Sequence, residues 1–88
     1  MQLDDCLFCR IARGEIPAAK VYEDDEVLAF KDIHPKAPVH FLIIPKKHIQ
    51  SLAHAEPEDY ALLGKMLGLT RKLAMQEGAV NGFRVIIN

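Results

Sequence analysis

The sequence lacks a long hydrophobic run, an excess of charge of one sign and any internal repeat. No apolar stretch approaches the roughly 18 residues that a membrane-spanning helix needs. The acidic opening MQLDD also lacks the basic-then-apolar layout of a secretion signal. With a net charge of −1, the chain has none of the basic excess that nucleic-acid binders usually carry. We therefore expect a cytoplasmic protein that binds neither nucleic acid nor a membrane.

Two common catalytic signatures are missing as well. The sequence has no glycine-rich phosphate-binding loop, and no Ser-His-Asp order can be assembled from it. What is present is an ordinary globular composition, with 50% hydrophobic and 26% charged residues. At 88 residues the chain forms a single domain with a small core. Domains of this size often need a metal or a second subunit.

Hydrophobic periodicity and turn residues predict two helices and four strands. The apolar spacing before Gly14 indicates a short helix, whereas Pro57 and Gly78 are typical of the first position and the C-cap of a long one. The predicted elements are, in order, a helix over Cys6–Arg13, a hairpin of Lys20–Glu23 and Glu26–Phe30, a strand His40–Ile44, a helix from Pro57 to Gly78 and a strand Phe83–Ile87.

This order predicts an α+β fold, with helices packed on an antiparallel sheet. The strand His40–Ile44 is apolar without alternation, so we expect both of its faces to be buried. Phe83–Ile87 has no partner after it, so we expect a domain truncated at its C-terminal end, with one or more strands missing. The long helix is predicted to bury Leu62, Leu63, Met66, Leu67, Leu69, Leu73 and Ala74, and to turn Lys65, Arg71 and Lys72 outward.

Cys6 and Cys9 form a Cys-x-x-Cys pair. Two thiolates at this spacing can hold one side of a tetrahedral zinc ion, and His48 is the best third ligand. The sequence offers no obvious fourth ligand, since His54 is more simply a solvated side chain. A redox pair, or two cysteines partly buried in a helix, is an equally good interpretation.

Asp32 and His40 flank a proline-rich connection between two predicted strands. A carboxylate at a strand end is placed to accept two hydrogen bonds from a diol such as ribose. An aspartate here can equally cap the following turn, and chemistry alone favours the cap. His40 could brace a catalytic group or be an ordinary histidine at the start of a strand. Five apolar residues could wall a flat pocket for a base, although their default place is the core: Phe8, Ile11, Phe30, Ile33 and Leu42.

The run Asp32–Ile49 resembles the strand-loop-strand region of the histidine-triad (HIT) family, in its Hint branch. The resemblance extends over about residues 5–88. It is carried by Phe8–Ile11 and Gly14–Ala18 at the family's opening, by Glu23–Asp25 and Leu28–Phe30 in its first hairpin, and by Gly82–Asn88 near the end of the chain.

The resemblance implies a homodimer of α+β protomers that share an extended sheet. It implies binding of purine nucleotides such as AMP and cleavage of bonds to the α-phosphate, notably in phosphoramidates and aminoacyl-adenylates. By position, Asp32 becomes the ribose-binding carboxylate, the five apolar residues become walls of the base pocket, and His40 becomes a histidine that supports the active site. Asn88 becomes a polar contact near the phosphate. A structural zinc ion would be held by Cys6, Cys9, His48 and one histidine of the triad segment.

The sequence departs from the family in one respect, because it contains no His-x-His-x-His motif. The place of this motif falls after Asn88, so the nucleophilic histidine would lie beyond the chain. We expect the intact protein to be a HIT-type hydrolase, similar to purine nucleoside phosphoramidases, and the 88-residue chain alone to be inactive. The alternative is a non-catalytic module with this fold that binds a nucleotide or a protein partner.

Overall fold

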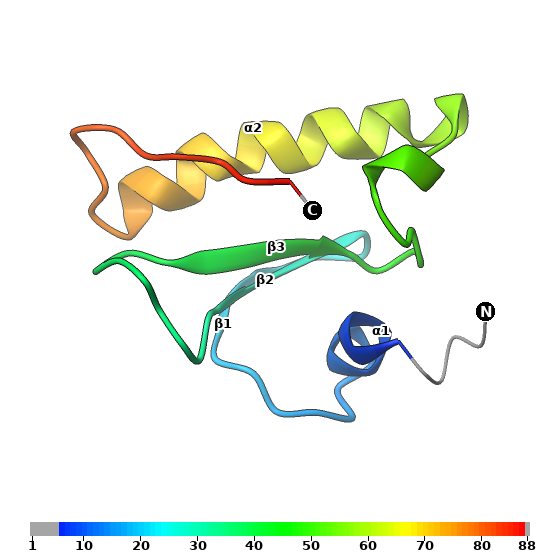
Figure 1. The fold of residues 1–88 in the computed structure, drawn as a ribbon, viewed down its shortest axis with the longest axis horizontal. Helices are drawn as coiled ribbons and strands as arrows, with labels where there is room; N and C mark the ends of the chain where they lie inside the picture. Colours follow the sequence, from blue (N-terminus) through cyan, green and yellow to red (C-terminus); the bar gives the residue numbers. More distant parts are fainter. Residues whose placement is uncertain (1–5, 88) are drawn as a thin grey trace.

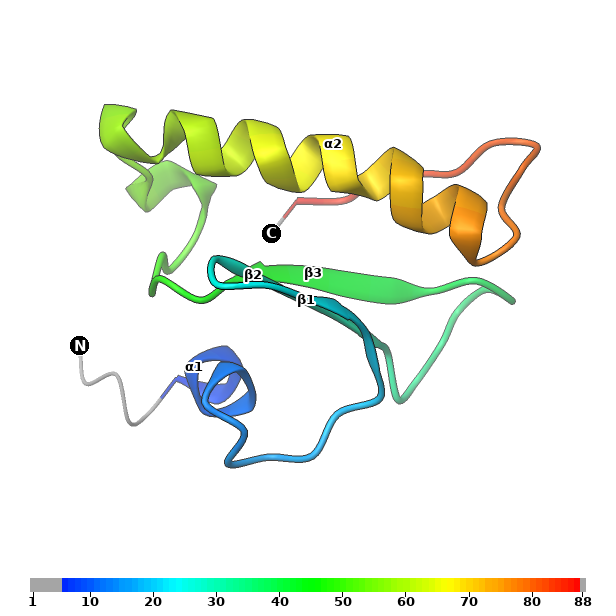
Figure 2. The same ribbon diagram turned by 180° about the vertical axis from the view of Figure 1, so that it is seen from behind.

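The computed structural model describes residues 6–87, which form an antiparallel sheet between two helices (Figures 1 and 2). This confirms the α+β fold, and most elements begin and end within a few residues of their expected positions. They are α1 (Leu7–Ala12), β1 (Lys20–Glu23), β2 (Val27–Lys31), β3 (Phe41–Pro45), 3₁₀ turns at Leu52–His54 and Pro57–Asp59, and α2 (Tyr60–Gln76).

The central strand β2 carries the core. The strand order is β1-β2-β3, with both pairs antiparallel. On one face, Leu28 and Phe30 pack with Ile44 of β3 and Ile11 of α1. On the other, Val27 and Ala29 pack with leucines of α2. Successive side chains of a strand point to opposite faces, so β2 supplies both clusters alternately.

The expectation that both faces of the strand His40–Ile44 are buried is wrong. Of β3, only Ile44 is fully buried, and the other four residues are half-buried. In the described part of the chain β3 is an edge strand, with β2 on one side only. The continuous apolar run is typical of a central strand, and here β2 occupies that position.

The tip of the β1–β2 hairpin is fastened to α2. Asp24 accepts backbone N–H bonds from Glu26 (2.8 Å) and Val27 (2.9 Å), which closes the turn. Lys65 lies 2.8 Å from a carboxylate oxygen of each of Asp24 and Glu26. Lys65 therefore turns toward the hairpin and not outward, a correction that only the tertiary fold reveals. Its ammonium and the Tyr22 hydroxyl hold the pKa of Asp24 well below its ordinary value.

Replacing Lys65 by methionine is expected to flatten the dependence of thermal stability on pH. A carboxylate with a lowered folded-state pKa stabilises the fold fully above the unfolded pKa of about 3.9, and this stabilisation is lost as the pH falls through the folded value. The wild-type Tm should thus fall more steeply below about pH 4 than that of Lys65→Met. Glu23, whose pKa is lowered to about 2 by Lys20 and Lys46, contributes equally to both proteins.

The matched control for this experiment is Arg71→Met, which removes an exposed cation from the same helix. Its melting curves, followed by circular dichroism, should keep the wild-type dependence on pH. Parallel plots of Tm against pH for Lys65→Met and wild type would contradict the assigned role of Lys65.

Helix α2 is bounded by two local signals. At its start, Glu56 and Asp59 form a reciprocal capping box around the turn that begins at Pro57. At its end, Gly78 adopts φ +98°, and the N–H of Ala79 donates to Ala74 O at 2.8 Å. This pattern is a Schellman motif, so Gly78 follows the helix in the expected C-cap role.

The buried face of α2 is narrower than expected. Leu69, Leu73 and Ala74 are buried, and Leu62 and Met66 pack beside them. Leu67 is instead 59% exposed. In the described residues the sheet is three strands wide, so it covers one line of the helix and leaves Leu67 outside.

The expected strand Phe83–Ile87 does not form within the described residues. The segment runs past α2 as irregular chain (Figure 1). Its four apolar side chains are exposed. Strand formation depends on a hydrogen-bonded partner more than on local propensity, and no strand pairs with this segment in the part that the structure describes. Asn88 lies outside the described residues. Within residues 6–87, no helix is long and apolar enough to cross a membrane.

Candidate functional site: a cysteine–histidine cluster and an aspartate–histidine pair

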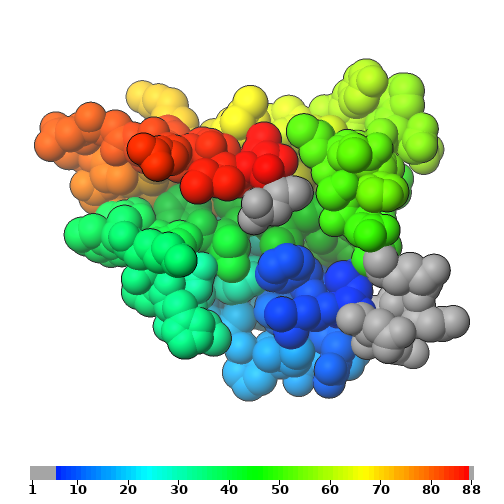
Figure 3. All heavy atoms as spheres, in the orientation of Figure 1, coloured from blue at the N-terminus to red at the C-terminus, as the bar shows by residue number. Residues whose placement is uncertain are grey.

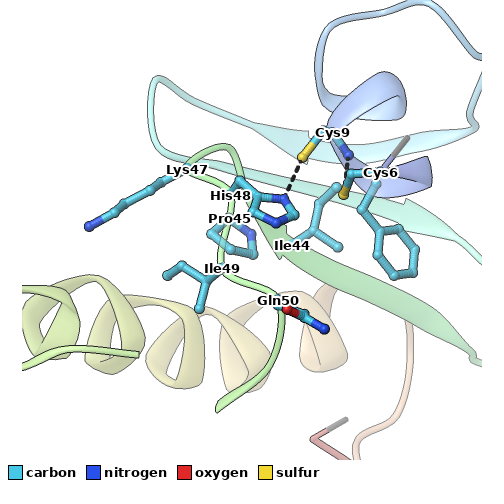
Figure 4. A pocket seen from close by; sticks show the side chains of 9 residues that line it. Cys6, Cys9, Ile44, Pro45, Lys47, His48, Ile49 and Gln50 are labelled. Atoms are coloured by element: carbon cyan, nitrogen blue, oxygen red, sulfur yellow. Dashed lines mark hydrogen bonds between the residues drawn. The ribbon is translucent and has the colours of Figure 1, made fainter. Parts of the chain in front are cut away.

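The two cysteines and His48 meet where α1 faces the loop that follows β3. The two Sγ atoms and a ring nitrogen of His48 all lie within 4.8 Å of one another. Cys9 Sγ is 2.9 Å from His48 Nδ1, and the Cys9 N–H donates to Cys6 Sγ at 3.3 Å. Figure 4 shows the imidazole of His48 turned toward the sulfur of Cys9. The three side chains named from the sequence are thus brought together.

Local structure explains this meeting. Cys6 is the N-cap of α1 and Cys9 lies in its first turn, so the helix presents both sulfurs at one end. Ile11 anchors α1 against the sheet beside Ile44, near the end of β3. Pro45 ends β3, and the chain then turns past the start of α1 (Figures 1 and 3). Residues 39 apart in the sequence become neighbours because the helix is fixed on the face where the strand ends.

The two thiols differ in acidity. A hydrogen bond with the Cys9 side chain lowers the pKa of Cys6, whereas burial is the first cause that raises the pKa of Cys9, to about 11. A metal cation reverses this effect of burial, because a coordinating thiol is deprotonated outright. Two sulfurs and one imidazole nitrogen are the donors that tetrahedral zinc prefers. The donor set therefore fits three of the four positions of a structural zinc ion.

The cluster forms one wall of a pocket of about 260 Å³. The other walls are mostly apolar, and Phe8 belongs to them. The pocket is lined by Cys6, Phe8, Cys9, Ile44, Pro45, Lys47, His48, Ile49 and Gln50 (Figure 4). His54 does not take part: it is exposed, and its Nδ1 lies 2.8 Å from Ser51 Oγ.

Asp32 and His40 lie together at the other end of the β2–β3 pair. Asp32 Oδ2 is 3.4 Å from His40 Nε2, and both side chains are about one-quarter exposed. Asp32 Oδ1 accepts the backbone N–H of His34 at 2.8 Å, and His40 Nδ1 accepts that of Lys36 at 2.9 Å. Asp32 therefore caps the following turn with one oxygen and presents the other to His40. The bond from His34 is the turn cap that the sequence predicted for Asp32. The bond from Lys36 to His40 was not foreseen, because any residue type supplies a backbone N–H.

The five apolar residues are not gathered around one pocket in residues 6–87. Ile11 and Phe30 are core residues, and Leu42 packs against them. Phe8 lines the pocket at the cysteines instead. Ile33 is 86% exposed beside Asp32. Their role as walls of a base pocket stays a prediction.

One buried carboxylate was not singled out from the sequence. Asp59 is 4% exposed, pairs with Lys47 and accepts the N–H of Glu56 at 2.9 Å. These contacts hold the pKa of Asp59 below its ordinary value, with the Glu56 N–H as the largest cause. The pair joins the loop that carries His48 to the start of α2. The available signal was Pro57 followed by two acidic residues, which is typical of the first turn of a helix.

The comparisons with known proteins agree over the whole described chain. Residues 5–87 match the family model described as "Scavenger mRNA decapping enzyme C-term binding". Protein HitA of Neisseria gonorrhoeae is 54% identical over 86 residues, which cover 98% of this chain and 80% of HitA. The chain belongs to the histidine-triad (HIT) family. A HIT-like protein of Synechocystis is 53% identical, over 97% of this chain and 75% of that protein.

Solved structures of HIT proteins have the same fold. A HIT family hydrolase from Legionella pneumophila superposes with a TM-score of 0.90 at 49% identity, over 96% of this chain and 78% of that one. A HIT family hydrolase from Clostridium thermocellum gives 0.92 at 41% identity, over 99% and 76%. Membership confirms the resemblance seen in the sequence, at the level of the family.

Proposed function

We propose that the protein is a HIT hydrolase or transferase of the Hint branch that binds a purine nucleotide and acts at its α-phosphate. Family membership supports this proposal. The observation that supports it in this chain is the Asp32–His40 pair, a part-exposed carboxylate and imidazole 3.4 Å apart, where β2 ends and β3 begins. A carboxylate in this position suits the two hydroxyl groups of a ribose.

The proposed reaction has two steps. A histidine beyond residue 88 attacks the α-phosphorus, and the bond to the amine or carboxylate leaving group breaks as the bond to the histidine nitrogen forms. Water then attacks the same phosphorus and releases the nucleotide from the histidine. Asp32 holds the ribose through both steps, and His40 supports the site from within the sheet. Phe8, Ile11, Phe30, Ile33 and Leu42 would wall the base, and Asn88 would contact the phosphate.

A structural zinc ion completes the proposal. Cys6, Cys9 and His48 would hold it, and a histidine of the triad segment would be the fourth ligand. Zinc would crosslink α1 to the loop after β3 and so fix the helix end that carries Phe8. Reduced thiols suit a cytoplasmic protein, since cysteines in that compartment bind metals more often than they form disulfides.

A second copy of the chain is the proposed protein partner. Leu67 and the segment Phe83–Ile87 expose apolar side chains along α2. Sharing a sheet across a two-fold axis would cover such side chains and give the open strand edge a partner.

The experiment that tests the function uses the product of the intact gene with adenosine 5′-phosphoramidate. We expect release of AMP and ammonia, and saturable binding of AMP to the protein without turnover. Tight AMP binding with no hydrolysis would favour the non-catalytic module instead. Absence of both activities would reject the nucleotide-based proposal.

A further inference from the structure

Asp32 and His40 are cross-strand neighbours on one side of the sheet. The last pair of the β2–β3 register is Lys31 with Phe41. The Asp32 N–H donates to His40 O at 3.2 Å, which continues the ladder by one step. Residues directly opposite in an antiparallel pair point to the same face. The contact between the two side chains is therefore fixed by the register of the sheet.

The hydrogen bond from Lys36 determines which ring nitrogen of His40 carries the proton. The backbone N–H of Lys36 donates to Nδ1, and a nitrogen that accepts carries no proton. In the neutral ring the proton is then on Nε2. The nitrogen that carries the proton is therefore the one 3.4 Å from Asp32 Oδ2.

Each oxygen of the Asp32 carboxylate has a polar neighbour. An ionised carboxylate has about four acceptor positions, two on each oxygen. The His34 N–H fills one position on Oδ1, and His40 Nε2 lies 3.4 Å from Oδ2. One acceptor position on each oxygen is left. Two hydroxyl donors on adjacent carbons, as in a ribose, match this pair of acceptors.

We propose that His40 is a positioning residue that fixes the plane of the Asp32 carboxylate and thereby makes the protein select ribonucleotides over 2′-deoxyribonucleotides. The inference rests on the proposed function, in which Asp32 receives the ribose hydroxyls. It assigns to His40 a task in substrate selection, exerted through Asp32 and without contact with the ligand.

Two substitutions of His40 distinguish the role of Nδ1 from that of Nε2. The amide of His40→Asn reaches the place of Nδ1, so it keeps the bond from Lys36 and loses the group that faces Asp32. The longer amide of His40→Gln reaches the place of Nε2 and keeps a donor toward Asp32. Calorimetric titration gives the ratio of the dissociation constants of 2′-deoxyAMP and AMP. We expect His40→Asn to lower this ratio by about fivefold, and His40→Gln to stay nearer to wild type.

His34→Gln is the matched control. The His34 side chain is exposed and only its backbone N–H contacts Asp32, so the ratio should not change. An unchanged ratio in His40→Asn, or an equal loss in His40→Asn and His40→Gln, would overturn the inference. Those results would leave the proposed function standing if the wild type binds AMP. A wild type that binds neither nucleotide would instead reject the proposed function itself.

Discussion

Cys9→Ser is expected to lower zinc affinity by more than about 100-fold, because even the outer-shell partners of zinc ligands contribute about 10–100-fold. The Cys9 sulfur lies 2.9 Å from His48 Nδ1 and within 4.8 Å of the Cys6 sulfur, so it joins both other donors. Elemental analysis should find about one zinc per chain in the wild type and almost none in the variant. The Tm of the wild type should fall on treatment with a chelator, since a metal that binds only the folded state stabilises it.

The control for the zinc experiment is His54→Ala. This histidine is exposed and outside the cluster, and its ring contacts Ser51. The variant should keep the wild-type zinc content. A metal-free wild type with two reactive thiols, or a Cys9→Ser protein with full zinc content, would contradict the assignment. Cys6 and Cys9 would then be a redox pair or ordinary residues of α1.

Asp32→Asn is expected to weaken AMP binding by about 1–3 kcal/mol, the scale of losing hydrogen bonds to a charged group. The substitution keeps the size of the side chain and an oxygen that can accept the His34 N–H, so the turn is preserved. It removes the charge and replaces one acceptor by an NH₂ donor, which cannot bind a hydroxyl proton. Calorimetric titration with AMP measures the change.

Asp25→Asn makes the same chemical change at the exposed tip of the β1–β2 hairpin. It should leave the AMP affinity within error of the wild type. Equal affinities for Asp32→Asn and wild type would remove the ribose-binding role, and the turn cap would be the whole function of Asp32.

Local patterns were enough to place most elements. The helix at the cysteines, the hairpin and the end of α2 are encoded by residues close in sequence, such as the turn at Asp24 and the glycine at position 78. The strand expected over Phe83–Ile87 did not form in the described residues, because a strand requires a partner that local propensity does not supply. Lys65 turns toward the hairpin because it pairs with the carboxylates of Asp24 and Glu26, which are 39 or more residues away in the sequence.

The candidate site was predicted at the level of residue types and less well at the level of contacts. Cys6, Cys9 and His48 lie together as the Cys-x-x-Cys spacing and the strand end at Pro45 indicated. The proximity of Asp32 to His40 depends on the β2–β3 register, which the sequence alone did not fix.

Calorimetric titration of the protein with AMP and, separately, with 2′,3′-dideoxyAMP directly tests whether the site at Asp32 binds a ribose. We predict saturable binding of about one AMP per chain, as expected for one ribose-binding carboxylate. The dideoxy analogue should bind more weakly by roughly the factor that Asp32→Asn loses, about 5–150-fold. Absence of saturable AMP binding, or equal affinity for the two nucleotides, would contradict the assignment of this site to a ribonucleotide.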